Sequence, residues 1–101
     1  MAHNFKINIH PTIDNLYIRL MGDFDGSSAF ELINAIKGNL KNSKYVKIDT
    51  RKLKKVYPFG QEVFNQNWSN VKDMQIEIEF VGPNALQIPQ PDDNLMTAEQ
   101  P

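Results

Sequence analysis

The chain has 101 residues, 41% of them hydrophobic and 23% charged, and a formal net charge of −1, which is the size and composition of one ordinary globular domain. The near-neutral charge argues against a dedicated nucleic-acid binder, and the absence of cysteine excludes disulfides and thiol catalysis. The N-terminal segment has no long apolar run, so we expect no signal peptide, no membrane span and a cytoplasmic location.

The first two predicted elements are strands that form a hairpin. Apolar and polar side chains alternate through residues 5–10, which is the period of a half-buried strand. Residues 11–15 contain a proline and an Asp-Asn pair, a composition typical of a turn. The alternation resumes over residues 16–21, so we expect the two strands to pair with each other.

A helix is predicted after residues 25–28, where Asp, Gly and two Ser interrupt the strand. Ser28 and Glu31 have the spacing of a capping box, in which each side chain meets a backbone N–H that the helix leaves unpaired. Apolar residues at helical spacing mark the expected buried face: Phe30, Ile33, Ile36 and Leu40.

The second half of the chain repeats the order strand, helix, strand. Residues 45–50 and 74–80 alternate as strands, and the helix between them begins near Pro58, because proline is tolerated in a first helical turn. The expected buried side chains of this helix are Val63, Phe64 and Trp68.

The last residues have a different composition, rich in proline and without periodicity. We therefore expect a single domain over residues 1–88 and a flexible tail over residues 89–101, with Leu86 and Ile88 as anchors.

The topology follows from the connections. Strands joined through a helix should be parallel neighbours with right-handed crossovers. All four strands alternate, whereas parallel strands covered on both faces have continuous apolar runs, so both helices should cover one face. The predicted fold is a two-layer α/β sandwich with a mixed four-to-five-stranded sheet and an N-terminal hairpin. The open face of the sheet would carry Lys6, Asn8, Tyr17, Arg19, Lys47, Asp49, Gln75, Glu77 and Glu79.

Three short motifs mark the ends of the predicted strands. Residues 16–25, LYIRLMGDFD, combine an apolar strand with Gly, an acid, an apolar residue and Asp. Residues 46–50, VKIDT, form a strand ending in Asp and a small polar residue, and residues 56–60 read VYPFG. In this order the motifs resemble the STAS domains of sulfate transporters and bacterial anti-sigma-factor antagonists. The resemblance spans roughly residues 5–82 and implies the STAS fold and a protein partner, such as a regulator or a kinase-like protein.

The third motif departs from that family at the position of its regulatory switch. The antagonists have Asp-Ser-Ser-Gly there, and phosphorylation of the first serine by a partner kinase disrupts their complex. Here Tyr57 stands at the Asp position, Pro58 and Phe59 stand at the serine positions, and Gly60 remains. Because proline and phenylalanine cannot be phosphorylated, the resemblance implies a regulatory binding module without this switch.

The resemblance implies a contact surface made of the GDFDG turn at residues 22–26, the YPFG turn at residues 57–60 and the start of the second helix. Aromatic side chains anchor many protein interfaces, and an exposed Tyr57 beside Phe59 would suit that role. The residues predicted to bind a partner are Asp23, Asp25, Tyr57, Phe59, Gln61 and Glu62.

Basic residues concentrate between positions 41 and 55, where the single acid is Asp49. One hypothesis is a basic patch that meets an acidic protein surface, a phosphorylated ligand or an anionic membrane. The other is a solvated lysine-rich loop with no specific partner. The patch would comprise Arg51, Lys52, Lys54 and Lys55.

Catalytic and metal sites find little support in the sequence. The pair Asp23 and Asp25 superficially resembles the nucleophile loop of haloacid-dehalogenase-type phosphatases, with Thr50 and residues 92–93 in support. Those enzymes need a larger sheet, and the simpler interpretation is that the two aspartates stop the strand and cap the helix. His3 and His10 lack an acidic companion for zinc, and Asn34 stands where a calcium loop needs glutamate.

We therefore expect a protein that is not an enzyme and uses no cofactor. Two alternatives to a protein-binding role remain open. The first is a small anionic ligand, such as a nucleotide or lipid headgroup, held by the amides at the helix starts and nearby lysines. The second is self-association, such as a homodimer formed through the open face of the sheet.

Overall fold

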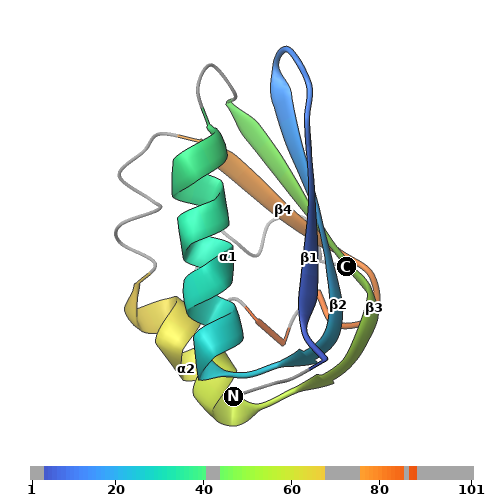
Figure 1. The fold of residues 1–101 in the computed structure, drawn as a ribbon, viewed down its shortest axis with the longest axis vertical. Coiled ribbons are helices and arrows are strands. Elements are labelled where there is room, and N and C mark those ends of the chain that lie inside the picture. Colours follow the sequence, from blue (N-terminus) through green and yellow to red (C-terminus); the bar gives the residue numbers. More distant parts are fainter. Residues whose placement is uncertain (1–3, 41–43, 68–75, 86, 89–101) are drawn as a thin grey trace, which may run out of the picture.

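The fold is a four-stranded mixed sheet covered on one face by two helices (Figure 1). The computed structural model describes residues 4–40, 44–67, 76–85, 87 and 88. Its elements are β1 (Lys6–Pro11), β2 (Asn15–Phe24), α1 (Gly26–Asn39), β3 (Tyr45–Val56), α2 (Pro58–Gln66) and β4 (Glu77–Val81).

The strand order is β1-β2-β3-β4, with β1 antiparallel to β2 and the remaining pairs parallel. Both helical crossovers step across the sheet in the same direction, and crossovers of this kind are right-handed, so α1 and α2 lie on the same face. The predicted two-layer α/β sandwich, its N-terminal hairpin and its mixed sheet are confirmed.

The hydrophobic core lies between the sheet and the two helices. Alternate residues of the central strands point into it, as the period of two requires. The buried apolar side chains are Leu16, Ile18, Leu20, Phe24, Ala29, Leu32, Ile33, Ala35, Ile36, Val46, Ile48, Leu53, Val63, Phe64 and Ile88. Phe64 also packs edge-on against Phe80 of β4, with ring centroids 5.7 Å apart.

Strands β2 and β3 run further than the sequence predicts. The second strand, predicted to end at residue 21, continues to residue 24 in β2, and the third, predicted to end at residue 50, continues to residue 56 in β3, so the lysine-rich segment is strand and not the loop of one of the two hypotheses. The register between these strands shifts after Arg19 and after Gly22. Such bulges insert an extra residue and change which side chains face the core. In β3 the alternation breaks at Arg51 and Lys52, which are both exposed, and Leu53 is the next buried residue, whereas β2 keeps its alternation as far as the buried Phe24.

The predicted capping box of Ser28 and Glu31 at the start of α1 is wrong. The cap is Asp25, whose carboxylate accepts hydrogen bonds from the Ser28 amide at 3.0 Å, the Ser28 hydroxyl at 2.9 Å and the Ser27 hydroxyl at 3.0 Å. Ser28 lies inside the helix and is buried, whereas Glu31 is exposed and is not part of a box. The helix therefore begins earlier than predicted, with Asp25 supplying the acceptor that its first amides need.

The buried face of α1 also differs from the prediction at one position. Ile33 and Ile36 are buried as expected, and Leu40 is half-buried at the helix end. Phe30, expected in the core, is 51% exposed. The neighbouring Ala29 is fully buried instead, on the same face as Leu32 and Ile36.

The second helix begins at Pro58 as predicted and buries Val63 and Phe64. Trp68 lies outside the described residues, as do Leu86 and the segment 89–101. Ile88 is fully buried in the core.

Candidate binding surface

The two turns that the sequence analysis selected lie against each other at the helix starts. The amide of Tyr57, which caps α2, donates a hydrogen bond of 2.9 Å to the carbonyl of Phe24 at the end of β2. A Cβ atom added at Gly60 would lie 2.7 Å from the same carbonyl oxygen. The first turn of α2 therefore packs directly on the backbone that joins β2 to α1.

Aromatic side chains are exposed on this joined surface. Tyr57 is 39% exposed and Phe59 is 64% exposed. The ring of Phe59 lies across Gly26, where an added Cβ would come within 2.7 Å of it. Phe30 follows Gly26 by one helical turn on the same face of α1, so it extends the surface that Phe59 begins. We call Phe30, Tyr57 and Phe59 the aromatic surface.

Sequence reasoning missed Phe30 as a surface residue because its spacing suits a buried stripe equally well. The signal that could have found it is the alternative stripe of Ala29, Leu32, Ile33 and Ile36, which has the i, i+3, i+4, i+7 spacing of a buried helix face and leaves Phe30 outside.

The remaining residues predicted to bind a partner differ in how much of them is accessible. Glu62 is exposed, and Gln61 and Asp23 are half-buried. Asp23 lies in β2, where its carbonyl accepts a hydrogen bond of 3.2 Å from the Ser28 hydroxyl.

The carboxylate of Asp25 caps the N-terminus of α1. Partial burial alone would raise the pKa of Asp25, but the hydrogen bonds from the Ser28 amide and the two serine hydroxyls lower it below its ordinary value. The carboxylate thus stays ionised at the start of α1, where it occupies the position that an anionic ligand would need.

The predicted basic patch divides between two places on β3. Lys52 and Lys54 are exposed, and the Lys55 ammonium lies 5.4 Å from the centre of the Tyr57 ring, next to the aromatic surface. Arg51 instead binds Asp49 on the open face of the sheet.

The residues considered for catalysis or metal binding have structural roles or lie elsewhere. Thr50 is buried, and its hydroxyl donates to the Val81 carbonyl at 2.7 Å and accepts from the Asn84 amide at 3.2 Å. His10 is exposed on β1, and His3 and residues 92–93 lie outside the described part of the chain. Within the described ranges, no three His, Cys, Asp or Glu side chains gather closely enough to hold a metal ion.

Neither described helix has the length and apolar character that a bilayer crossing requires.

No family model and no curated protein sequence matches the chain. Solved structures do resemble it. The anti-sigma factor antagonist SpoIIAA in its unphosphorylated form matches with a TM-score of 0.58 and 12% identity, over 88% of this chain and 89% of SpoIIAA. An uncharacterized DUF3478-family protein from Shewanella loihica, described as having a SpoIIAA-like fold, matches with a TM-score of 0.58 and 15% identity, over 86% of this chain and 73% of that protein.

A crystal structure of Mglu matches with a TM-score of 0.65 and 12% identity over 75% of this chain, which spans only 19% of Mglu. Identities this low show the fold alone. The chain therefore has the SpoIIAA-like fold of the STAS domains, which the sequence motifs predicted.

Proposed function

We propose that this chain, on its SpoIIAA-like fold, is a non-enzymatic protein-interaction module that regulates a partner through the aromatic surface. The observation that carries the proposal is the exposure of Phe30, Tyr57 and Phe59 at the joined helix starts. Large aromatic side chains contribute most of the binding energy in many interfaces, since they bury large apolar areas at a small cost in conformational entropy.

The fold supports a protein as the partner. SpoIIAA is an anti-sigma factor antagonist, and the present chain matches almost its whole length. The aromatic surface includes Tyr57 and Phe59 of the VYPFG motif, which by sequence resemblance stands where antagonists carry their phosphorylated serine. Phosphorylation at the two serine positions of the antagonist motif cannot occur in this chain, because neither Pro58 nor Phe59 has a hydroxyl group.

The state of the nearby carboxylates supports a role without catalysis. Asp25 is engaged by two serines as a helix cap, and Asp23 is a strand residue whose neighbour across the sheet is Lys55.

The exposed lysines in the second half of β3 favour an acidic partner. Lys52 and Lys54 are exposed on β3, and Lys55 flanks Tyr57. Charges at the edge of an interface act mainly on the association rate. Replacing all three lysines with glutamate should slow association strongly at low salt and leave the melting temperature unchanged. Equal association rates for wild type and variant would show that these lysines do not contribute to binding of the partner.

The test of the proposal is capture of a partner from the native organism's lysate, followed by measurement of its affinity with purified proteins. The variants are Phe59→Ala and Phe30→Ala, compared with Ile13→Ala as a matched control. Ile13 is 89% exposed but lies in the β1–β2 turn, at the far end of the molecule from the helix starts.

We expect wild type and Ile13→Ala to bind the partner equally. Loss of an aromatic anchor should raise Kd by about 30-fold or more, the effect typical of an interface hot spot. All three variants should melt near the wild-type temperature, because the substituted side chains are exposed. Binding that survives both aromatic substitutions would refute the proposed surface.

A further inference from the structure

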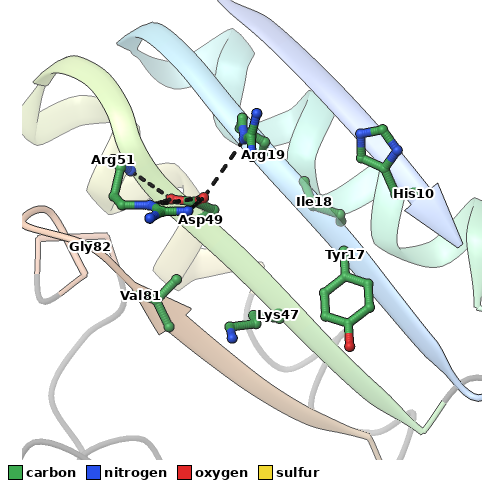
Figure 2. A pocket seen from close by; sticks show the side chains of 9 residues that line it. All are labelled: His10, Tyr17, Ile18, Arg19, Lys47, Asp49, Arg51, Val81 and Gly82. Carbon is green, nitrogen blue, oxygen red and sulfur yellow. Dashed lines mark hydrogen bonds and ion pairs between the residues drawn. The ribbon is translucent and has the colours of Figure 1, made fainter. Parts of the chain in front are cut away.

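A pocket of about 450 Å³ lies on the open face of the sheet, on the side away from the core (Figure 2). It crosses all four strands and ends at the turn after β4. Its lining residues are His10, Tyr17, Ile18, Arg19, Lys47, Asp49, Arg51, Val81 and Gly82.

The pocket contains one carboxylate held between two guanidinium groups. Arg51 contacts Asp49 through two nitrogen atoms, with Nη2 to Oδ2 at 2.8 Å and Nε to both carboxylate oxygens at 3.1 Å. Arg19 lies on the other side of Asp49, with Nε 3.7 Å from Oδ2, as Figure 2 shows. The Arg51 hydrogen bonds, with smaller effects from the charges of both arginines, lower the pKa of Asp49 against the opposing effect of burial.

Asp49 therefore stays ionised and orients both arginines, while its own charge offsets only one of them. The Asp49 side chain is 15% exposed, whereas the Arg19 side chain is 46% exposed. The N–H groups of Arg19 that Asp49 does not contact remain accessible from the pocket. A guanidinium held in place in this way is well suited to bind a planar anion such as a carboxylate, or a phosphate.

Lys47 is a further cation that lines the pocket, two residues before Asp49 on β3, and it is half-buried. It is opposite Tyr17 on β2 and opposite Glu79 on β4. The Glu79 carboxylate accepts a hydrogen bond from the Tyr45 hydroxyl, and Glu79 and Lys47 form no ion pair. Among the residues that the structure describes, Lys47 has no ion pair.

The far wall of the pocket is fixed to β3 by hydrogen bonds. The hydroxyl of Thr50, on the core side of β3, holds the Val81 carbonyl at 2.7 Å and the Asn84 amide at 3.2 Å. Gly82 has a φ of 104°, and a Cβ added there would lie 3.0 Å from Cγ of Arg51. The turn after β4 thus packs against Arg51, so the concave shape is built into the fold.

We propose that this pocket is a binding site for a small organic anion with a carboxylate or phosphate group. Lys47 and Arg19 contact the anionic group, and Tyr17 and Val81 flank the carbon skeleton of the ligand. Asp49 and Arg51 position the site. It lies on the opposite layer from the aromatic surface, so it does not depend on the function proposed there and can be tested separately.

The test is titration of the full chain with three probes, citrate, glycerol 3-phosphate and AMP, with inorganic phosphate as a fourth. Binding is followed by calorimetry and by amide chemical shifts in two-dimensional NMR spectra. The variants are Lys47→Met and Arg19→Met. Lys6→Met is the matched control, because Lys6 is exposed on the open face, carries the same charge and does not line the pocket.

We expect at least one probe to bind wild type and Lys6→Met with the same Kd and to shift the amides of residues 17–19 and 47–51. Lys47→Met and Arg19→Met should each raise Kd by about tenfold or more, the loss expected for one charged hydrogen bond. Lys47→Arg should restore most of the affinity. A preference for citrate identifies a carboxylate ligand, and a preference for glycerol 3-phosphate or AMP identifies a phosphate ligand.

Three results would overturn the proposal. The first is the absence of binding by every probe at about 10 mM, where even a weak site would be occupied. The second is equal weakening by Lys6→Met and Lys47→Met, which would show a general charge effect. The third is a dimer in sedimentation that Lys47→Met dissociates, which would make this face an interface between copies of the chain.

Discussion

Gly38 and Gly60 both lie inside helices, yet the structure predicts that replacing them with alanine has opposite effects on stability. Alanine normally stabilises a helix by about 1 kcal/mol relative to glycine, because glycine loses more backbone freedom on folding. Whether that gain is realised depends on what the added methyl group meets.

At Gly60 the methyl group would meet backbone. It would lie 2.7 Å from the carbonyl oxygen of Phe24 and 2.9 Å from the carbonyl carbon and oxygen of Asp25. These atoms belong to the connection between β2 and α1 and cannot rotate away as a flexible side chain could. Overpacking of this kind costs about 1–3 kcal/mol, whereas alanine in the first turn of a helix, which frays, gains only about 0.5 kcal/mol. We expect Gly60→Ala to lower the free energy of unfolding by about 1–2 kcal/mol.

Gly38 is the matched control. An added Cβ there would meet nothing within 4 Å, and the residue is exposed near the end of α1. We expect Gly38→Ala to raise the free energy of unfolding by about 0.5 kcal/mol, somewhat less than at a helix centre because helix ends fray.

The assay is urea unfolding of wild type and both variants, followed by circular dichroism. The free energies are comparable where the dependence on urea is the same for all three proteins. Amide chemical shifts of Phe24 and Asp25 should move in Gly60→Ala alone. A Gly60→Ala protein as stable as wild type would refute the close packing of α2 on the β2–α1 connection.

Further predictions concern two titrating side chains. Asp25→Ala should lower the free energy of unfolding by about 1–2 kcal/mol in the same urea assay, because the first turn of α1 loses its cap. Folding lowers the pKa of Asp25, so the ionised carboxylate stabilises the folded state. This stabilisation is complete above the unfolded pKa of about 3.9 and is lost as the pH falls through the folded pKa. Asp25→Asn should therefore lose less stability than wild type in acid melting curves. Burial, followed by the hydrogen bond and charge of Glu79, raises the pKa of Tyr45 to about 12. An ultraviolet titration should therefore show one late tyrosine that disappears in Tyr45→Phe, and stability should decline as pH rises from about 10 toward that value. A Tyr45→Phe protein that keeps the late step would contradict this assignment.

Local patterns in the sequence were sufficient for the main architecture. The alternation of apolar and polar residues predicted the strands, and the absence of continuous apolar runs placed both helices on one face. Proline at the start of α2 was also sufficient to place that helix. These features depend on the period of side chains along the backbone, so they can be recognised without knowledge of distant contacts.

Other features were decided by contacts between segments far apart in the chain. The register shifts between β2 and β3 arise from the pairing of these strands. Whether Ala29 or Phe30 faces the core depends on how α1 packs on the sheet. The pocket likewise exists only because the parallel register places Arg19 opposite Asp49. Periodicity shows which side of an element a residue occupies, whereas its neighbours across strands depend on register, which the tertiary structure alone determines.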